Sequence, residues 1–224
     1  MYRIVTKISR PDAALIKEFE EICTADLADA MGKERLGCVD QNIKAVTKQN
    51  KFVGFAFTVQ THEGSNLILH KAMSMAQKDD VIVVDAGQNQ TVAVWGGTFA
   101  LICKQRSIRG AVIDGAVRDL AAINAIEFPV FARSVSPAGP SKLPGSINIP
   151  IVCGGIYITP GDLVVADADG VIVVPKEHIE MVLKAAKEVK HKAEDMERRV
   201  RLGEFPFDFL GMSKLLDGQN VQTE

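Results

Sequence analysis

The feature that most constrains the fold is an alternation of short apolar runs with helical patterns in the first 132 residues. The apolar runs are rich in β-branched and aromatic residues, which favours strands. They lie at 52–60, 81–84, 110–113 and 128–132, and the stretches between them predict helices at 67–76, 98–104 and about 118–125. Strands that alternate with helices form a layered α/β core in which at least some strands pair in parallel.

The segment before this core is helical in pattern. Apolar residues recur at helical spacing over 11–33, and a second short helix is expected to restart at Thr24 and to end at Gly32. After residue 133, frequent proline and glycine residues separate short apolar runs, which is typical of short strands joined by tight turns.

The C-terminal third closes with two clearer elements. Two apolar runs, 163–166 and 171–174, flank a polar turn and predict a hairpin. Residues 176–202 are charged and carry one apolar stripe, so they predict a long helix that stops at Gly203. We therefore expect an α/β catalytic domain over 1–175. A helical extension over 176–224 would pack on the same domain or on a neighbouring subunit.

Composition narrows the class of protein. The 224 residues carry a formal net charge of −2 and a pI near 6.1, so the chain lacks the basic field of a nucleic-acid-binding protein. The start of the chain is too polar for a signal peptide, and no apolar run is long enough to span a membrane. The four cysteines are widely spaced and form no zinc or disulfide pattern. The expectation is a cytoplasmic protein with no nucleic-acid or membrane partner.

An arginine and an aspartate follow the strand expected at 110–113. Asp114 and Gly115 predict a turn there, and Arg118 and Asp119 then fall in a loop or first helical turn, where neighbouring side chains can converge on one pocket. Asp119 could hold a hard cation such as Mg²⁺, and Arg118 could bind a carboxylate or stabilise an oxyanion. A surface ion pair with Asp119 as a helix cap explains the same residues equally well.

Two glycines form the second candidate. In Trp95-Gly96-Gly97-Thr98-Phe99 they precede a predicted helix, so backbone N–H groups could receive a carboxylate or enolate oxygen. A tight strand-to-helix connection that uses the conformational freedom of glycine is the ordinary alternative. A glycine-rich nucleotide-binding fingerprint is absent from the sequence, which disfavours a methyltransferase.

Taken together, six segments of the chain resemble the RraA-like family. The family includes 4-hydroxy-4-methyl-2-oxoglutarate aldolases and oxaloacetate decarboxylases, and its members are often mislabelled as dimethylmenaquinone methyltransferases. The segments that carry the resemblance are 24–32, 67–72, 83–87, 95–100, 113–119 and 160–171.

The resemblance implies a layered β/β/α fold like that of swivelling phosphohistidine domains, assembled as a homotrimer or homohexamer. It implies Mg²⁺, or another divalent cation such as Mn²⁺, on Asp119, and substrate binding by Arg118. It further implies a backbone cradle for the pyruvate part of a 2-oxo acid, formed by Gly96, Gly97, Thr98 and Phe99. An acidic residue of a neighbouring subunit would complete the site, and Glu194 is the candidate.

Two departures from relatives bear on the reaction. Some aldolases carry an acid where this chain has Gly97, so its absence favours decarboxylation over retro-aldol cleavage. Ser65 stands where relatives often have aspartate. Two alternatives stay open: a Schiff-base aldolase that uses one of three lysines, and a protein-binding regulator of a ribonuclease, as in some relatives. The three lysines are Lys71, Lys104 and Lys142.

Overall fold

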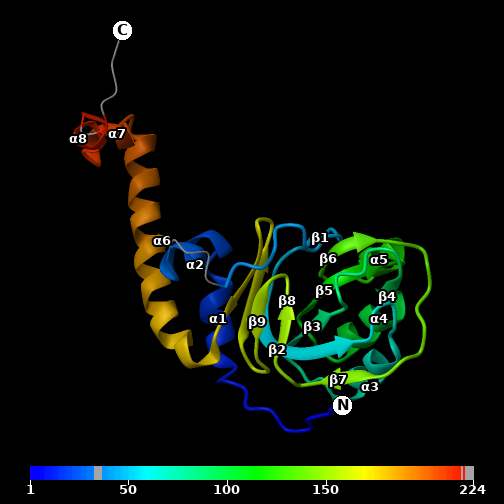
Figure 1. Ribbon diagram of the computed structural model, residues 1–224. Helices are drawn as coiled ribbons and strands as arrows, with labels where there is room; N and C mark the ends of the chain where they lie inside the picture. Colours follow the sequence, from blue (N-terminus) through cyan, green and yellow to red (C-terminus); the bar gives the residue numbers. More distant parts are fainter. Residues whose placement is uncertain (33–36, 218, 220–224) are drawn as a thin grey trace.

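The computed structural model describes residues 1–32, 37–217 and 219, and Figure 1 shows its arrangement. Lys33, where the expected helical range 11–33 ends, and the last residues of the C-terminal extension lie outside the described residues. Within them, eleven strands form a nine-stranded and a two-stranded sheet. The strands are β1 Lys44–Ala45, β2 Phe52–Thr61, β3 Asp80–Asp85, β4 Ala93–Trp95, β5 Gly110–Val117, β6 Val130–Val135, β7 Gly145–Ile147, β8 Ile151–Cys153, β9 Ile156–Ile158, β10 Leu163–Asp167 and β11 Gly170–Val174.

The main sheet runs in the order β1-β6-β5-β3-β2-β10-β11, with β4 paired to β5 and β7 paired to β2. The strands expected from the apolar runs, β2, β3, β5 and β6, are all parallel to their neighbours within this set. The expected hairpin is also present, because β10 and β11 pair antiparallel. The predicted partly parallel α/β core is therefore confirmed.

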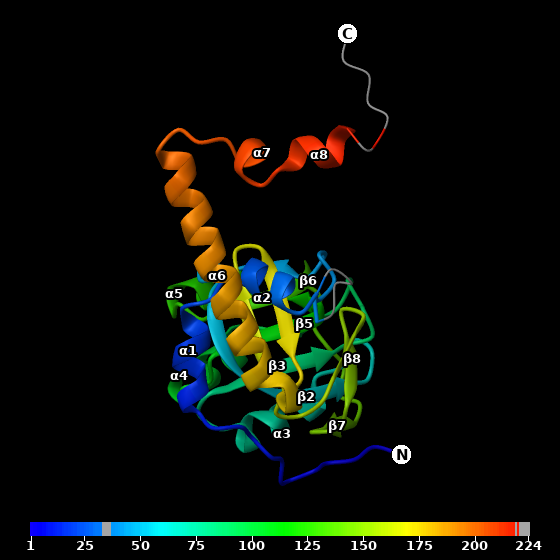
Figure 2. The ribbon, with the colours of Figure 1, turned by 90° about the vertical axis from the view of Figure 1, so that its left-hand side faces the viewer.

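Most of the helices cover the outside of this sheet, whereas the last two lie away from it, as Figures 1 and 2 show. Helices α3 Leu67–Met75, α4 Gly97–Gln105 and α5 Leu120–Ala125 bury apolar side chains in a first cluster over the parallel strands. Helices α1 Ala14–Glu20, α2 Thr24–Ala30 and α6 Ile179–Arg201 do so in a second cluster over β2, β10 and β11. A third cluster fills the inside of the curved sheet, where β8 and β9 also contribute. The remaining two α-helices are α7 Pro206–Phe209 and α8 Met212–Asp217.

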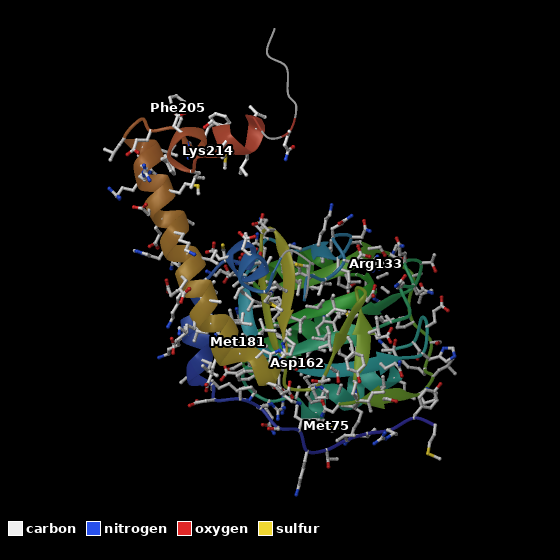
Figure 3. All side chains as sticks on the ribbon, turned by 60° about the vertical axis from the view of Figure 1, so that its left-hand side comes forward. Met75, Arg133, Asp162, Met181, Phe205 and Lys214 are labelled. Carbon is white, nitrogen blue, oxygen red and sulfur yellow. The ribbon has the colours of Figure 1, made fainter. Side chains whose placement is uncertain are left out.

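The long helix α6 has two halves with different surroundings. Its first turns pack on the body of the protein through Ile179, Val182, Leu183 and Ala186, which are all buried. Its second half projects from the body and carries α7 and α8; Figure 3 labels Phe205, directly before α7, and Lys214 on α8. Gly203 follows the end of α6 with a φ of +89°, as expected for a helix stop. The division of the chain at residue 175 stays a prediction. No helix in the described ranges is long and apolar enough to cross a membrane.

Two details of the region before Asp119 differ from expectation. Asp114 and Gly115 do not form a turn but lie within β5, which runs to Val117 and shifts register against β6 between Ile113 and Ala116. The following helix begins at Leu120 rather than at Arg118. An irregularity of this kind lets a strand continue through a turn-like sequence when both of its neighbours supply partners.

Asp114 instead belongs to a buried charge network that links β5, β6 and the turn between β8 and β9. One of its carboxylate oxygens accepts from Arg133 Nε at 2.5 Å, and the other accepts from the Gly154 N–H at 2.7 Å. Arg133 also donates to Asp40 at 2.8 Å, and the Asn42 backbone N–H, followed by this bond, lowers the pKa of Asp40. The side chains of Arg133 and Asp114 are only 7% and 2% exposed, so each charge depends on its partner.

Replacing Arg133 by methionine should therefore lower the free energy of unfolding strongly. The change leaves Asp114 buried without its partner, and such losses cost about 3–5 kcal/mol. Urea unfolding monitored by circular dichroism measures the effect. The matched control is Arg201→Met, which removes an exposed ion pair with Glu197 and should cost below about 1 kcal/mol. Equal effects of the two changes would contradict the role assigned to Arg133.

Candidate active site

The short strand β4 determines where the candidate residues meet. It pairs in parallel with the end of β5, with Trp95 opposite Val117, and the Arg118 N–H donates to the Trp95 carbonyl at 3.0 Å. Because the carboxyl ends of parallel strands lie at the same edge, the residues that follow each strand become neighbours. Gly96 and the start of α4 thus lie beside Arg118 and Asp119.

Asp119 adopts an unusual backbone conformation. Its φ of +63° and ψ of +35° place it in the left-handed region, which few residues other than glycine, asparagine and aspartate adopt. Its side chain does not cap α5; instead Oδ2 accepts the Gly97 N–H at 3.2 Å. Arg118 Nε lies 3.7 Å from the same oxygen, and both side chains are close to half exposed. The ion pair is present, and Asp119 stands at the N-cap position of α5, but its carboxylate makes no capping hydrogen bond to that helix.

Gly96 and Gly97 are needed because a side chain would not fit at either position, and not because the backbone adopts a conformation that favours glycine. Gly96 has an extended backbone, with φ −163°, and no positive φ is recorded for Gly97. A Cβ atom on Gly96 would lie 2.6 Å from Asp119 Oδ2, and one on Gly97 would lie 3.2 Å from the Ala122 Cβ. A side chain at either position would therefore press on the Asp119 loop. The connection from β4 to α4 is tight, as expected, but it does not use the conformational freedom of glycine.

A cavity of about 360 Å³ opens over these residues. Five of the predicted site residues line it, namely Gly96, Thr98, Phe99, Arg118 and Asp119, whereas Gly97 contacts the site only through its bond to Asp119. Glu194 lies exposed on the projecting half of α6 and does not line the cavity of its own chain. The other lining residues are Asn66, His70, Ala93, Val94, Trp95, Gly139, Pro140 and Lys142. Of these, only Lys142 was expected as a candidate catalytic residue, for a Schiff base.

Three of these additional residues form a polar wall. Lys142 Nζ lies 2.5 Å from Asn66 Oδ1 and 3.0 Å from His70 Nε2. Partial loss of hydration at the wall, together with the positive charge of Lys142, lowers the pKa of His70 below its usual value. The His70 ring also contacts the edge of Phe99, with 4.8 Å between ring centroids. Of the three lysines considered for a Schiff base, only Lys142 lines this cavity; Lys71 is exposed on α3, and Lys104 donates to the Glu127 carbonyl.

Ser65 holds this wall in place. Its hydroxyl is fully buried, accepts the Leu143 N–H at 2.7 Å, and lies 2.9 and 3.2 Å from the carbonyl oxygens of Leu143 and Ser141. The backbones also bond directly, since Ser141 donates to Gly64 at 2.9 Å. The loop that carries Lys142 is thereby fixed to the start of α3, which gives Ser65 a structural purpose that the sequence did not indicate.

The residues present fit a hydrated magnesium ion better than a fully protein-bound cation. No group of three or more His, Cys, Asp or Glu side chains suitable for a metal occurs among the described residues, and Asp119 is the one carboxylate that lines the cavity. Magnesium keeps several waters and is often held by one or two carboxylates together with the substrate. The space that a Gly96 side chain would fill lies directly beside Asp119 Oδ2. Asp119 could thus hold such an ion.

Comparison with known proteins shows the relationships of the chain. The family described as RraA-like, Aldolase/RraA, matches residues 24–173. The chain belongs to the RraA-like family. A protein from Halalkalibacterium halodurans, provisionally named 4-hydroxy-4-methyl-2-oxoglutarate aldolase, is 41% identical over 194 residues, which cover 86% of this chain and 91% of that protein.

Solved structures of RraA-like proteins share the fold. A protein of unassigned function from Pseudomonas syringae superposes with a TM-score of 0.79 at 26% identity, covering 89% of this chain and 93% of its own. RraAS2 of Streptomyces coelicolor, described as an unusual member of the RNase ES inhibitor RraA family, gives 0.76 at 25% identity, covering 86% and 99%. The α/β architecture expected for an RraA-like protein, with its long C-terminal helix, is confirmed.

Removing the Ser65 hydroxyl should destabilise the fold. Ser65→Ala leaves the Leu143 N–H without its acceptor in a buried place, which costs about 1–3 kcal/mol. Thermal unfolding measures the change. Ser74→Ala is the matched control, because its exposed hydroxyl only donates to the Lys71 carbonyl within α3. Indistinguishable melting of the two variants would show that Ser65 does not hold the wall.

Proposed function

We propose that this RraA-like protein is a divalent-metal-dependent lyase that releases pyruvate from small 2-oxo acids. The reaction is retro-aldol cleavage of 4-hydroxy-2-oxo acids, decarboxylation of oxaloacetate, or both. The observation that carries the proposal is the meeting of Arg118, Asp119 and the start of α4 in one small cavity. The aldolase name of the Halalkalibacterium relative supports a lyase of this kind.

The start of α4 suits the carboxylate end of the substrate. The first N–H groups of a helix lack partners within the helix, and the helix dipole favours negative charge there. The Gly97 N–H is used by Asp119, while no partner is recorded in the described structure for the Thr98 N–H, which faces the same end. This donor is available to an anionic ligand.

Asp119 would hold the metal ion, and Arg118 would stabilise the negative charge that develops on the substrate. A divalent cation bound at Asp119 would act as a Lewis acid toward the 2-oxo group. The Arg118 guanidinium lies against Asp119 and against Gly139, where a Cβ atom would be 3.1 Å from Arg118 Nη1. In this position it can donate to the oxygen that becomes negative as the bond from C3 to C4 breaks. The glycine at 139 leaves the guanidinium free to take that place.

The opposite wall suits a second negative group on the substrate. Lys142 carries a positive charge into the cavity and is directed by Asn66 and His70. Together with Arg118 it outweighs the single carboxylate of Asp119, so the lining favours anions. We propose that the substrate is a dicarboxylate whose second carboxylate binds Lys142.

The lining also bears on which bond is cleaved. Retro-aldol cleavage needs a group that accepts the proton of the C4 hydroxyl, whereas decarboxylation of oxaloacetate needs none. With glycine at position 97, Asp119 is the one acid that lines the cavity of the described chain. We therefore propose decarboxylation as a main or competent activity, with retro-aldol cleavage requiring a water or an acid supplied by a neighbouring subunit, for which Glu194 is the candidate. A homotrimer or homohexamer would provide such a neighbour.

Changing the central pair should abolish pyruvate release. Asp119→Asn keeps the left-handed backbone accessible but removes the charge that would hold the cation, so kcat/KM should fall at least about 100-fold. Arg118→Lys keeps the charge but loses the planar donor fork, and should cost about 10²–10³ in kcat. The measurement is a coupled pyruvate assay with oxaloacetate and with 4-hydroxy-2-oxo acids, in the presence of Mg²⁺.

Three controls make this assay decisive. Asp169→Asn, in the exposed β10–β11 turn, should retain full activity. A chelator should abolish turnover, and Mg²⁺ or Mn²⁺ should restore it. Activity that persists with a chelator, together with borohydride trapping of pyruvate on Lys142, would replace the metal mechanism by a Schiff base. Full activity of both site variants would refute the assignment of the pair.

Gly96→Ala should damage the site without unfolding the protein. The added Cβ would lie 2.6 Å from Asp119 Oδ2, so the carboxylate must move, while the extended backbone at residue 96 accepts alanine. We expect at least about a tenfold loss of kcat/KM, because small displacements of catalytic groups are costly. Circular dichroism and the pyruvate assay together check this. Wild-type activity would show that Asp119 does not need the space.

The relation to RraAS2 supports a second candidate, a regulator that binds a ribonuclease. Such a protein needs no arginine and aspartate in a common cavity, so the pair favours the enzyme. Recovery of a ribonuclease complex by the purified protein, with no turnover of any 2-oxo acid, would favour the regulator.

A further inference from the structure

The start of α3 presents two hydrogen-bond acceptors to the cavity. Asn66 and His70 are four residues apart and therefore lie on the same face of the helix. Both contact the same atom, Lys142 Nζ, at 2.5 and 3.0 Å. An ammonium group has three N–H donors and no lone pair, so Lys142 donates in both contacts. One N–H of Lys142 remains for a ligand.

These contacts determine the form of the His70 ring. Since Lys142 donates, Nε2 must carry a lone pair, and the ring proton of the neutral imidazole must lie on Nδ1. The lowered pKa keeps the ring neutral near pH 7. Besides Lys142, the charged groups that line the same cavity are Arg118 and Asp119. The edge contact with Phe99 restrains the ring plane.

The contact also limits the freedom of Lys142. A lysine side chain loses much of its rotamer entropy when it is fixed. Lys142 is an exposed residue on a loop, and its ammonium is directed by the two acceptors of α3 rather than by burial. A ligand that binds an already directed ammonium does not have to meet this cost.

We infer that His70 is a positioning residue, which accepts an N–H of Lys142 at Nε2 and thereby aims the ammonium at the second carboxylate of the substrate. The inference rests on the proposed function, because it takes the dicarboxylic 2-oxo acid as the ligand of Lys142. His70 itself need not touch the substrate. In oxaloacetate this second carboxylate leaves as CO2 when the C3–C4 bond breaks, so the contact stabilises the bound substrate and is lost as CO2 forms. The contribution of His70 is therefore expected in KM rather than in kcat.

The test uses two variants that differ in where they place an acceptor. Glutamine at position 70 puts Oε1 near the place of Nε2, whereas asparagine puts Oδ1 near the place of Nδ1. His70→Gln should keep the KM for oxaloacetate within about threefold of wild type. His70→Asn should raise it about fivefold or more, as expected for the loss of one hydrogen bond, with a smaller change in kcat. Equal KM values for the two variants would overturn the inference.

A binding experiment separates this inference from the proposed function. Calorimetry with Mg²⁺ compares 2-oxoglutarate, a dicarboxylate, with 2-oxobutyrate, which has one carboxylate. His70→Asn should weaken only 2-oxoglutarate, and His70→Gln should weaken neither by more than about threefold. If calorimetry gives this result but the pyruvate assay detects no turnover, His70 remains a positioning residue and the lyase activity is rejected. Turnover with no difference between the two ligands would retain the lyase and reject the inference.

Magnetic resonance tests the tautomer without any substrate. The ¹⁵N shifts of His70 should show protonation at Nδ1 and a lone pair at Nε2 near pH 7. Lys142→Met should raise the pKa of His70, because it removes a neighbouring positive charge. A ring protonated at Nε2, or a pKa unaffected by Lys142→Met, would overturn the inference.

Discussion

The site depends on one parallel strand pairing, that of β4 with the end of β5. Only three residues of β4 are involved, yet their register places the residues after Trp95 beside those after Val117. The main chain bond from Arg118 to Trp95 fixes this register. The buried Arg133–Asp114 pair anchors the same strand from the inner face of the sheet. The geometry of the candidate site and the stability of the fold thus both depend on β5.

The cavity combines a small volume with an excess of positive charge. Arg118 and Lys142 oppose one carboxylate, Asp119, and the cavity of about 360 Å³ has space for only a small ligand. Because Arg118 and Asp119 lie close together and Lys142 lies on a separate wall, the two ends of a ligand meet different chemistry. The proposed substrate, a short chain with a carboxylate at each end, matches this division.

Much of the core could be predicted because its signals are local. The four apolar runs became β2, β3, β5 and β6 with ends that moved by a few residues, and the positions of Arg118 and Asp119 after β5 followed from that pattern. The strand β4 was missed, since three residues show no periodicity. Its pairing with β5 joins residues more than 20 positions apart in the sequence, such as Ala93 and Ala116, which no local pattern indicates.

The polar wall could not be predicted for a related reason. Asn66 and Lys142 are separated by 76 residues, and their proximity depends on Ser65, whose hydroxyl ties the two segments together. Lys142 was one of three candidate lysines, with no pattern to prefer it. The left-handed conformation of Asp119 was also invisible, because aspartate in a first helical turn usually indicates a cap.

That conformation has a consequence for the evolution of stability. A non-glycine residue in the left-handed region costs the fold of order 1 kcal/mol, and the Asp119 carboxylate is one of the few side chains that tolerate it. Glycine would relieve the backbone and remove the charged group at once. A glycine at this position would thus be expected to stabilise the fold while removing the group proposed to hold the cation, so stability and the proposed chemistry make opposite demands on residue 119.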